Sequence, residues 1–562
     1  MQKIYLDFET YYDVQLTLSK MSTVQYINHP DFKVWGVGIK VEDGPTEWYN
    51  EEETPDILAQ IDWDETAVVC HNTLFDAYIL TQYFGYKPAF YYDTAAMARG
   101  LYPNMSASLA KSCEREFPND LSMRKGEELV NAKGVRDLDP ELDSQIGGYC
   151  VQDVDLTYAL FQSYIQNYPD KELRIIDLTV RMFVEPKLML DRGLLTTYKD
   201  EMATRTQNAI QASGLTREVL ASQVKFKEHL ESLGIVVPTK KSPTTGQQIP
   251  AFGKNDSAYI QMCQMYPEYS DIWEARELVK SRIEETRAQR FIDSTNPDGT
   301  FSVPLRYYAA HTGRFGGSDK INLQNLPRGS TLRRAIMAPP GQRLYIADLS
   351  NIEARMLAWL AKEYDLVQAF ATGRDVYCEF ASQIYGRTIT KDDKLERYVG
   401  KTGSPSVDVS DTVAQTIVAQ YRGMYPNIPM LWSSMKDSLF QMLNPRGVGL
   451  KYGPLTIERQ ALGLPNGMHL KYPGLYYSAG NFMYKTDRSI VRTHGPRVTE
   501  NVVQALSRLV ITDQMLDIQS LPEVDIVLQV HDEIIAIGSK LQADDTMNRI
   551  IDILRTAPEW CS

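Results

Sequence analysis

The segment KIYLDFE, residues 3–9, most constrains the fold of this chain, because its side chains alternate strictly between two faces. One face is apolar and the other carries Asp7 and Glu9, the period of two that predicts a β-strand with one buried side. Such a strand needs neighbours, and the sequence predicts them in the order strand, strand, helix, helix at Val34–Val41, Thr66–Cys70, about 75–84 and about 153–164. This succession predicts an α/β domain that ends near residue 170.

A chain of 562 residues is too long for one hydrophobic core, so two to four domains are expected. Its net charge of −13 argues against a nucleic-acid partner, but the charge is unevenly spread. Residues 1–170 hold 12 basic and 28 acidic residues, whereas the remainder holds 47 and 44 and leaves room for a basic cleft. The sequence has no apolar run that could cross a bilayer, no signal peptide and no paired cysteine motif, so we expect a cytoplasmic protein without a membrane partner.

Five residues of the first domain form a pattern suited to phosphodiester hydrolysis: Asp7, Glu9, Asp76, Tyr149 and Asp153. Asp7 and Glu9 leave one face of a strand, and Tyr149 lies one helical turn before Asp153. Carboxylate oxygens select Mg²⁺ or Mn²⁺, and two such ions could clamp the attacking water and the leaving oxygen while the phenol orients the water. Each residue alone has a simpler reading, as an exposed acid, a helix cap or a core tyrosine. Only the combination favours a site.

Two aspartates in the rest of the chain indicate a second metal site. Asp348 ends the predicted strand in PPGQRLYIADLS, and Asp532 lies at the tip of a predicted hairpin in VDIVLQVHDEIIAI. On neighbouring strands of one sheet, the two carboxylates could hold the metals that activate a primer 3′-hydroxyl and receive pyrophosphate. Either aspartate alone would be an ordinary turn residue. Between these sites, the segment VPTKKSPTTGQQIP, residues 237–250, predicts an exposed loop.

These motifs resemble those of two enzyme families. DxE, HNxxFD and YxxxD, in this order within residues 1–165, resemble the three motifs of the proofreading exonucleases with a catalytic tyrosine, the DEDD superfamily. HTGRFGGSDKINLQNLPRG, DLSNIE and VHDE resemble the TGR…NLQNIP signature, motif A and motif C of family A DNA polymerases, above all those of bacteriophages. The resemblance implies an α/β RNase H-like exonuclease domain followed by an α+β right-hand polymerase domain. The expected ranges are 1–170 for the exonuclease, 171–562 for the polymerase, about 185–300 for the thumb, about 301–365 and 475–562 for the palm, and about 366–474 for the fingers.

The resemblance also assigns roles by position. It makes Asp7, Glu9, Asp76 and Asp153 metal ligands of the exonuclease, with Tyr149 beside them. The metal ligands that it implies for the polymerase are Asp348, Asp532 and the backbone carbonyl of Leu349. The DNA contacts that it implies are Arg314, Gln324, Asn325, Asn501, Gln504 and His531. Arg314 would contact the minor groove of the primer-terminal pair, where acceptors recur on every correct base pair. For Gln324 and Asn325 the alternative is an ordinary polar loop.

Three residues are expected to contact the incoming nucleotide. In the family, the residue at Glu353 is a steric gate that closes the space beside the sugar 2′ carbon and rejects ribonucleotides. The pattern S-x-x-E of residues 350–353 is also a helix capping box, which would explain Glu353 without any role in sugar selection. Arg397 and Lys401, four apart on one helix face, match the residues that grip the triphosphate in the family. An exposed basic stripe is their alternative.

The resemblance breaks down after Lys401. The family continues this helix to an aromatic residue four positions on and a Tyr-Gly pair eight positions on, whereas this chain has Pro405 and Val409 there. The segment TGSPSVDVSD cannot continue a helix, so the tyrosine on which the incoming base stacks is absent from the sequence. We therefore expect the encoded chain to hold further residues between about 401 and 404 and after Ser562.

The sequence thus predicts template-directed DNA synthesis with 3′→5′ proofreading, in the replication of a phage genome. We expect a monomer that binds primer–template DNA, dNTPs and two Mg²⁺ or Mn²⁺ ions per active site, with a helicase or other replisome proteins as candidate partners. Two alternatives stay open: an exonuclease whose polymerase-like platform binds DNA without polymerising, and a non-catalytic DNA-binding scaffold. Intact carboxylates at both sites argue against the scaffold, whereas the break after Lys401 leaves the first alternative open.

Overall fold

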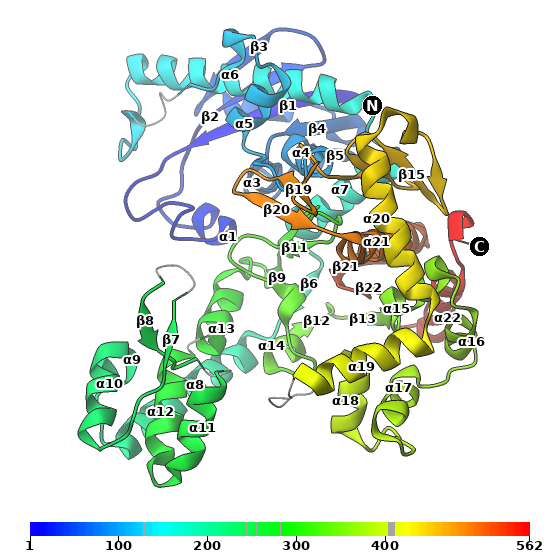
Figure 1. Ribbon diagram of the computed structural model, residues 1–562. Coiled ribbons are helices and arrows are strands. Elements are labelled where there is room, and N and C mark those ends of the chain that lie inside the picture. The colour runs from blue at the N-terminus through cyan, green and yellow to red at the C-terminus, as the bar shows by residue number, and fades with distance from the viewer. Residues whose placement is uncertain (127–130, 243–245, 254–255, 282, 403–410, 562) are drawn as a thin grey trace.

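The computed structural model describes residues 1–126, 131–242, 246–253, 256–281, 283–402 and 411–561. Its first domain lies at the top of Figure 1, above a lobe at the lower left, a lobe at the lower right and a central sheet between them. The expected segment of extra chain near residue 401, together with Pro405 and Val409, lies outside the described residues, and so does Ser562. Among the described helices, none combines the length and the apolar character that a membrane span requires.

The first domain is built on a five-stranded sheet with the strand order β3-β2-β1-β4-β5. Strand β1 pairs antiparallel with β2 and parallel with β4, and β4 pairs parallel with β5. The strands span Gln2–Thr10 (β1), Val34–Val41 (β2), Thr46–Asn50 (β3), Thr66–Cys70 (β4) and Phe90–Asp93 (β5). The expected α/β fold is confirmed, and β2 and β4 have the predicted bounds.

Helices cover this sheet. The long helix α6 packs along β1, β2 and β3, and α7 packs against β5. The helices of this region are α1 (Thr23–Ile27), α2 (Thr54–Ala59), α3 (Leu74–Tyr78), α4 (Thr94–Leu101), α5 (Leu109–Glu116), α6 (Pro140–Ile165) and α7 (Asp170–Val184). The helix predicted at about 75–84 is α3 followed by a π-helix, Ile79–Tyr83, and the helix predicted at about 153–164 is only the second half of α6. Asp139 caps α6 and Pro140 occupies its first position, so the helix begins well before the predicted start at about 153.

The lower-left lobe in Figure 1 is helical and has a small core of its own around Phe226 and Leu230. Its helices are α8 (Arg192–Ser213), α9 (Arg217–Ala221), α10 (Gln223–Ser232), α11 (Ser257–Met265), α12 (Ser270–Lys280) and α13 (Ile283–Asp293). Residues 237–250, expected as a loop, include the hairpin β7 (Thr239–Lys241) and β8 (Gln248–Pro250), whose side chains are mostly exposed. Backbone pairing needs no buried face, so the polar composition did not reveal it.

The central sheet has the order β13-β22-β21 and is antiparallel throughout. Its strands are β13 (Gln342–Asp348), β21 (Val524–Val530) and β22 (Glu533–Ser539), as the turn, strand and hairpin patterns predicted. Helices α21 (Gly495–Gln519) and α22 (Ala543–Arg555) pack against it, and α15 (Ile352–Ala361) packs against α21. Beside it lie the small sheet of β6 (Leu188–Leu190), β9 (Thr300–Phe301) and β12 (Ile336–Met337), the pair β10 (Leu305–Arg306) and β11 (Gly316–Gly317), and α14 (Thr331–Arg334).

The expected fingers range, about 366–474, contains two parts. Helices α16 (Tyr364–Ala371), α17 (Val376–Tyr385), α18 (Lys394–Thr402) and α19 (Asp411–Met424) form the lower-right lobe. Helix α20 (Asn427–Leu443) instead packs along α21 and leads into two small sheets near the first domain. Their strands are β14 (Lys451–Tyr452), β15 (Leu455–Glu458), β16 (Ala461–Gly463) and β17 (His469–Lys471), then β18 (Tyr476–Ser478), β19 (Asn481–Lys485) and β20 (Ile490–Thr493).

A buried ion pair joins α7, which packs against β5 of the first domain, to α21, which packs against the central sheet. Glu172 on α7 is 2% exposed and Arg508 on α21 is 4% exposed, and the guanidinium donates to both carboxylate oxygens. Tyr307 Oη donates to the same carboxylate at 2.6 Å and Asn466 Nδ2 at 2.8 Å. Because these groups come from four separate segments, they fix the orientation of the two domains.

Candidate active sites

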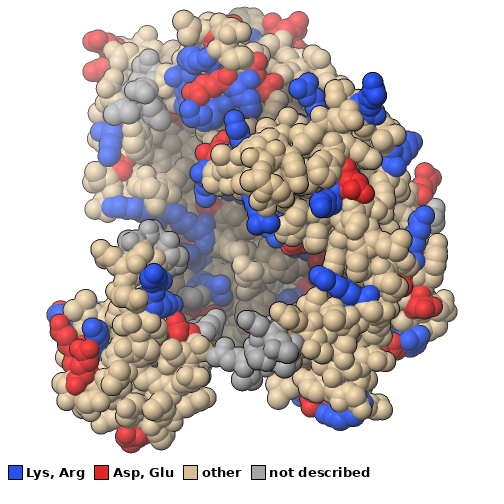
Figure 2. All heavy atoms as spheres, in the orientation of Figure 1, with Lys and Arg blue, Asp and Glu red and all other residues tan. Residues whose placement is uncertain are grey.

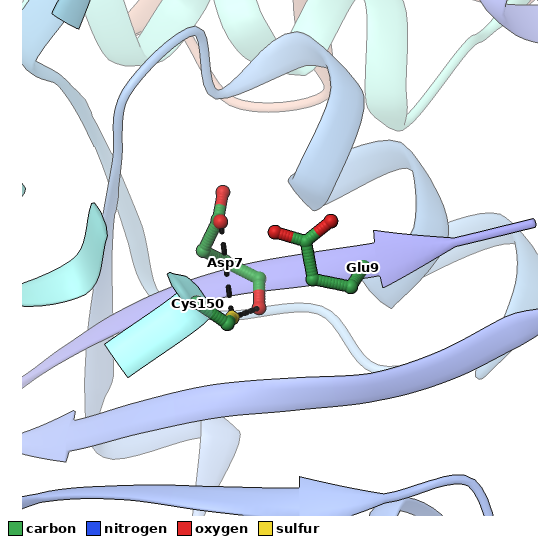
Figure 3. Close-up of side chains that lie close together, drawn as sticks. All are labelled: Asp7, Glu9 and Cys150. Atoms are coloured by element: carbon green, nitrogen blue, oxygen red, sulfur yellow. Dashed lines mark hydrogen bonds between the residues drawn. The ribbon is translucent and has the colours of Figure 1, made fainter. Parts of the chain in front are cut away.

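The first site lies on the face of β1 that carries Asp7 and Glu9. Both carboxylates leave the same side of the strand, as Figure 3 shows, and Glu9 is buried. Asp76, buried on α3, accepts a hydrogen bond from the Phe8 N–H at 3.0 Å, which holds the helix against the strand between the two acids. The structure therefore brings together the three acids that the spacing predicted.

Cys150 is a neighbour of these acids that the sequence did not indicate. Its Sγ donates to the Asp7 carbonyl at 3.2 Å and lies 3.8 Å from Asp7 Oδ2 (Figure 3). One Asp7, one Glu9 and one Cys150 ligand atom lie within 4.8 Å of one another. Burial and the nearby Asp7 hold the pKa of the thiol well above its ordinary value, so Cys150 keeps its proton here and donates it to Asp7.

Asp153 and Tyr149 reach the same site from α6, and both are buried. Lys125 forms an ion pair with Asp153, and its Nζ lies 4.6 Å from the centre of the Tyr149 ring. Burial and then the Asp153 charge raise the pKa of the Tyr149 phenol, which stays protonated. Sequence reasoning missed Lys125, because a lone lysine in a polar segment carries no signal.

The electrostatics of this cluster favour a bound divalent cation. Burial and repulsion from Asp153 raise the pKa of Asp7 to about 7, against the opposing charge of Lys125. Burial and the charge of Asp7 also raise the pKa values of Glu9 and Asp76. Four carboxylates share one lysine here, and hard oxygen donors with excess negative charge fit Mg²⁺ or Mn²⁺.

The second site lies where β13 ends beside the β21–β22 turn. Asp348 pairs with Glu533 across the sheet, and the Leu349 N–H donates to the Asp532 carbonyl at 2.9 Å, which places the two aspartates side by side. Burial and the Asp532 charge raise the pKa of Asp348, although Arg328 lies 2.9 Å from its Oδ2 and opposes them. Two neighbouring carboxylates at a sheet edge again fit a divalent cation.

The turn that carries Asp532 is supported from behind by Gln324. His531 has a φ of 54°, in the left-handed region that costs a side-chain-bearing residue energy unless neighbours hold it. Gln324 Oε1 accepts from the His531 N–H at 2.8 Å, and Gln324 Nε2 donates to the Gln529 carbonyl at 2.6 Å. Gln324 is 6% exposed and both ends of its amide are engaged within the protein. Gln324 thus positions this turn, and its contact with DNA stays a prediction, as does that of Asn325, which is exposed beside it.

Glu353 forms an ion pair with Arg314 across the cleft above the second site. The capping-box interpretation of Glu353 is wrong. Helix α15 begins after Asn351, whose φ of 58° turns the chain before the helix, and no side chain caps it. Instead Asn351 Oδ1 accepts from the Tyr377 hydroxyl at 3.0 Å. Glu353 thus has no role as a cap and faces the cleft.

A cavity of about 270 Å³ lies above this site. Its lining joins most of the residues that the motifs indicated and adds Tyr377, which the sequence analysis missed: Arg314, Gln324, Glu353, Tyr377, Lys401, Gln504, His531 and Asp532. Gln504 accepts from the Thr312 hydroxyl at 3.3 Å. Tyr377 lies near the start of α17, and no motif in the sequence marks it.

Five expected residues do not line this cavity: Asn325, Asp348, Leu349, Arg397 and Asn501. Arg397 points to Asp375, with Nε 2.9 Å from Oδ2, although it shares α18 with Lys401. Asn501 is 8% exposed and donates to the Tyr472 hydroxyl at 3.2 Å, so it packs beneath the small sheets and not against the cleft. Helical spacing places a residue on a face but does not show which neighbour that face meets.

Comparisons with known proteins match two parts of the chain to two families. Residues 48–166 match the family described as 3′-5′ exonuclease, and residues 192–441 match DNA polymerase family A. The chain is 37% identical over 147 residues to DNA polymerase I of Chloroflexus aurantiacus, covering 25% of this chain and 15% of that protein. It is 22% identical over 636 residues to the DNA polymerase of Bacillus phage SP02, covering 95% and 93%. The chain thus spans a small part of the first relative and nearly all of the second.

A solved structure supports the fold. It is described as the POL domain of Pol1 from M. smegmatis in complex with DNA primer-template and dNTP. The TM-score is 0.66 at 16% identity, and the match covers 98% of this chain and 92% of the other. At this identity the likeness shows the fold, and the expected succession of an exonuclease fold and a polymerase fold is confirmed.

Proposed function

We propose that this chain, which carries a 3′–5′ exonuclease domain followed by a family A DNA polymerase domain, extends a DNA primer on a template and removes mispaired 3′ ends. One observation carries the proposal: two carboxylate clusters lie on two different sheets of one chain, one around Asp7 and one around Asp348. Domains of both kinds generally use divalent metal ions. We infer two Mg²⁺ or Mn²⁺ ions at each site.

In the exonuclease, Asp7, Glu9, Asp76 and Asp153 would hold the metals. When bound, the ions would supply the charge that activates water and stabilises the leaving 3′ oxygen. Tyr149 keeps its proton and can donate a hydrogen bond that orients the attacking water. Cys150 and the Phe8 N–H hold Asp7 and Asp76 in place, so the carboxylates need little reorganisation.

In the polymerase, Asp348, Asp532 and the Leu349 carbonyl would hold the metals. These ions would supply the positive charge that activates the primer 3′-hydroxyl and stabilises the departing pyrophosphate. Lys401 lines the same cavity and would bind the triphosphate, whereas Arg397 would first have to leave Asp375. The hydrogen bonds that Gln324 forms with His531 and Gln529 hold the turn that carries Asp532. His531, on the same turn, would pack against the primer end.

Glu353 is proposed as the residue that rejects ribonucleotides. It faces the cavity between Arg314 and Lys401, and its carboxylate would occupy the space that a 2′-hydroxyl needs. Arg314 is paired with Glu353 and would contact the minor groove of the terminal base pair after this pair opens. Gln504, beside them, is proposed to contact the primer or template.

The hollow between the lobes is the proposed DNA-binding cleft. Figure 2 shows Lys and Arg side chains along its inner surface. We propose that a monomer binds primer–template DNA and dNTPs there, in phage genome replication, with a helicase or another replisome protein as a partner.

Primer extension tests the proposal. The wild type with Mg²⁺ and dNTPs should extend a primer, and without dNTPs it should shorten it. Asp532→Asn should abolish extension and spare degradation, whereas Asp7→Ala with Glu9→Ala should do the reverse, because distant sites act independently. Degradation without any extension would support the alternative of an exonuclease with a non-polymerising platform, and loss of both activities in a folded single-site variant would refute two separate sites.

A further inference from the structure

A large cavity adjoins the exonuclease carboxylates. It has a volume of about 1250 Å³ and lies between the first domain and the polymerase domain. One wall includes Asn72, Leu74 and Lys125 from the exonuclease domain, and the other includes Arg306 and the residues 486–488. Leu74 begins the helix that carries Asp76, and Lys125 pairs with Asp153, so two residues of the wall lie next to catalytic acids, although those acids do not line the cavity themselves.

The residues 486–488 form the tip of the β19–β20 hairpin, which belongs to the polymerase domain. In Figure 1 this hairpin lies beside α4 of the exonuclease domain. The Ser106 N–H donates to the Asp487 carboxylate, and the Asp487 N–H donates to the Asn104 carbonyl at 3.4 Å. The tip is closed by the Thr486 N–H, which donates to the Ser489 carbonyl at 2.9 Å. The hairpin is thus attached to the exonuclease domain next to the cavity.

The charged groups of the cavity wall favour a polyanion. Four of them are cationic: Arg99, Lys125, Arg306 and Arg488. Two of these cations already face an acid, because Arg99 lies 3.7 Å from Asp93 and Lys125 pairs with Asp153. The other acid of the wall, Asp487, accepts a hydrogen bond from the Ser106 N–H. Arg306 and Arg488 are exposed, and within the described part of the chain neither has an ion-pair partner, so these two supply the uncompensated positive charge. His71 adds no charge, because burial lowers its pKa to about 4.

The volume of the cavity distinguishes between polyanions. Pockets for small ligands have about 300–1,000 Å³, and this cavity exceeds them. A single dNTP would leave most of it empty, whereas an extended strand would place several phosphates along its cationic wall. Grooves of this kind, lined by Lys and Arg, bind single-stranded DNA through its backbone.

The single-stranded 3′ segment that the proposed exonuclease function requires would lie in this cavity. We propose that Arg488, carried by the polymerase domain, is a positioning residue for that strand. The inference rests on the proposed exonuclease function. It means that the exonuclease substrate site is completed by a hairpin of the other domain, and that Asp487 anchors this hairpin.

The test is Arg488→Ala in the full chain. Binding of a fluorescent oligothymidylate, followed by anisotropy in EDTA, should weaken about tenfold, as expected for the loss of one charge-assisted contact. The slope of log K against log salt should fall by about 0.7, the value for one phosphate of a single strand. With Mg²⁺, the KM for single-strand degradation should rise about tenfold with kcat unchanged, and extension of a matched primer should not change.

Two variants serve as controls. Arg488→Lys keeps the charge and should stay close to the wild type. Lys485→Ala removes an exposed cation of the same hairpin that does not line the cavity, and it should have no effect. An unchanged KM in Arg488→Ala, a fall in kcat alone, or an equal loss in Lys485→Ala would overturn the proposal. These results differ from failure of the exonuclease function itself, in which Asp7→Ala with Glu9→Ala would still degrade DNA.

Discussion

Removing the charge of Glu172 should destabilise the junction between the two domains. The side chain is almost fully buried, and its oxygens accept from Arg508, Tyr307 and Asn466. Glu172→Gln keeps the volume but leaves the Arg508 guanidinium buried without a counter-charge. Breaking a buried pair in this way costs about 3–5 kcal/mol of unfolding free energy. A large part of that loss should appear as faster hydrogen exchange in α7 and α21, together with a lower Tm.

A neighbouring ion pair offers a matched control. Lys171 and Asp513 join the same two helices at 3.1 Å, but the lysine is 61% exposed. Lys171→Ala should therefore cost less than about 1 kcal/mol, since water screens exposed pairs. Adding Arg508→Met to Glu172→Gln should restore much of the lost stability, because the unpaired charge is removed. Equal effects of Glu172→Gln and Lys171→Ala would refute the reasoning.

The same pair sets a pH dependence. Burial alone would raise the pKa of Glu172, but Arg508 and the hydrogen bonds hold it below its ordinary value of 4.5. A lowered pKa in the folded state means that the charged pair stabilises the fold at pH values above the ordinary pKa, and that this contribution is lost as the pH falls through the lowered pKa. The difference in unfolding free energy between the wild type and Glu172→Gln should therefore be constant near neutral pH and shrink only below about pH 4.5.

Two further predictions concern the sites. Glu353→Ala should raise the efficiency of rNTP incorporation relative to dNTP by up to about a hundredfold, which corresponds to about 2.7 kcal/mol. It should barely change Tm, because Glu353 does not cap α15. Unchanged sugar selection would refute the proposed role of Glu353. Mg²⁺ without DNA should raise the Tm of the wild type by relieving repulsion among the buried carboxylates, and this rise should shrink in Asp7→Ala with Glu9→Ala. An undiminished rise in that variant would place the binding elsewhere.

The sequence by itself determined the local elements and the order of the acids. Alternation in residues 3–9 and the polar tip at Asp532 specify strands and a turn, because backbone periodicity depends on near neighbours. It also indicated the resemblance to two families, since each motif that carries the resemblance is a short run of neighbouring residues. The S-x-x-E pattern at Glu353 failed for the same local reason: Asn351 adopts a left-handed turn that the pattern does not encode.

Only the tertiary structure decided how distant side chains are used. Gln324 was expected to contact DNA but supports the turn of His531, which lies more than two hundred residues away, and Arg397 turned to Asp375. Lys125 pairs with Asp153 of the exonuclease site, and the β19–β20 hairpin lines the cavity beside that site. The sequence near Lys125 and the sequence of the hairpin indicate neither contact. The physical reason is that periodicity fixes which face a side chain occupies. Which surface meets that face depends on how the domains pack, through contacts such as Glu172 with Arg508 that join residues far apart in the chain.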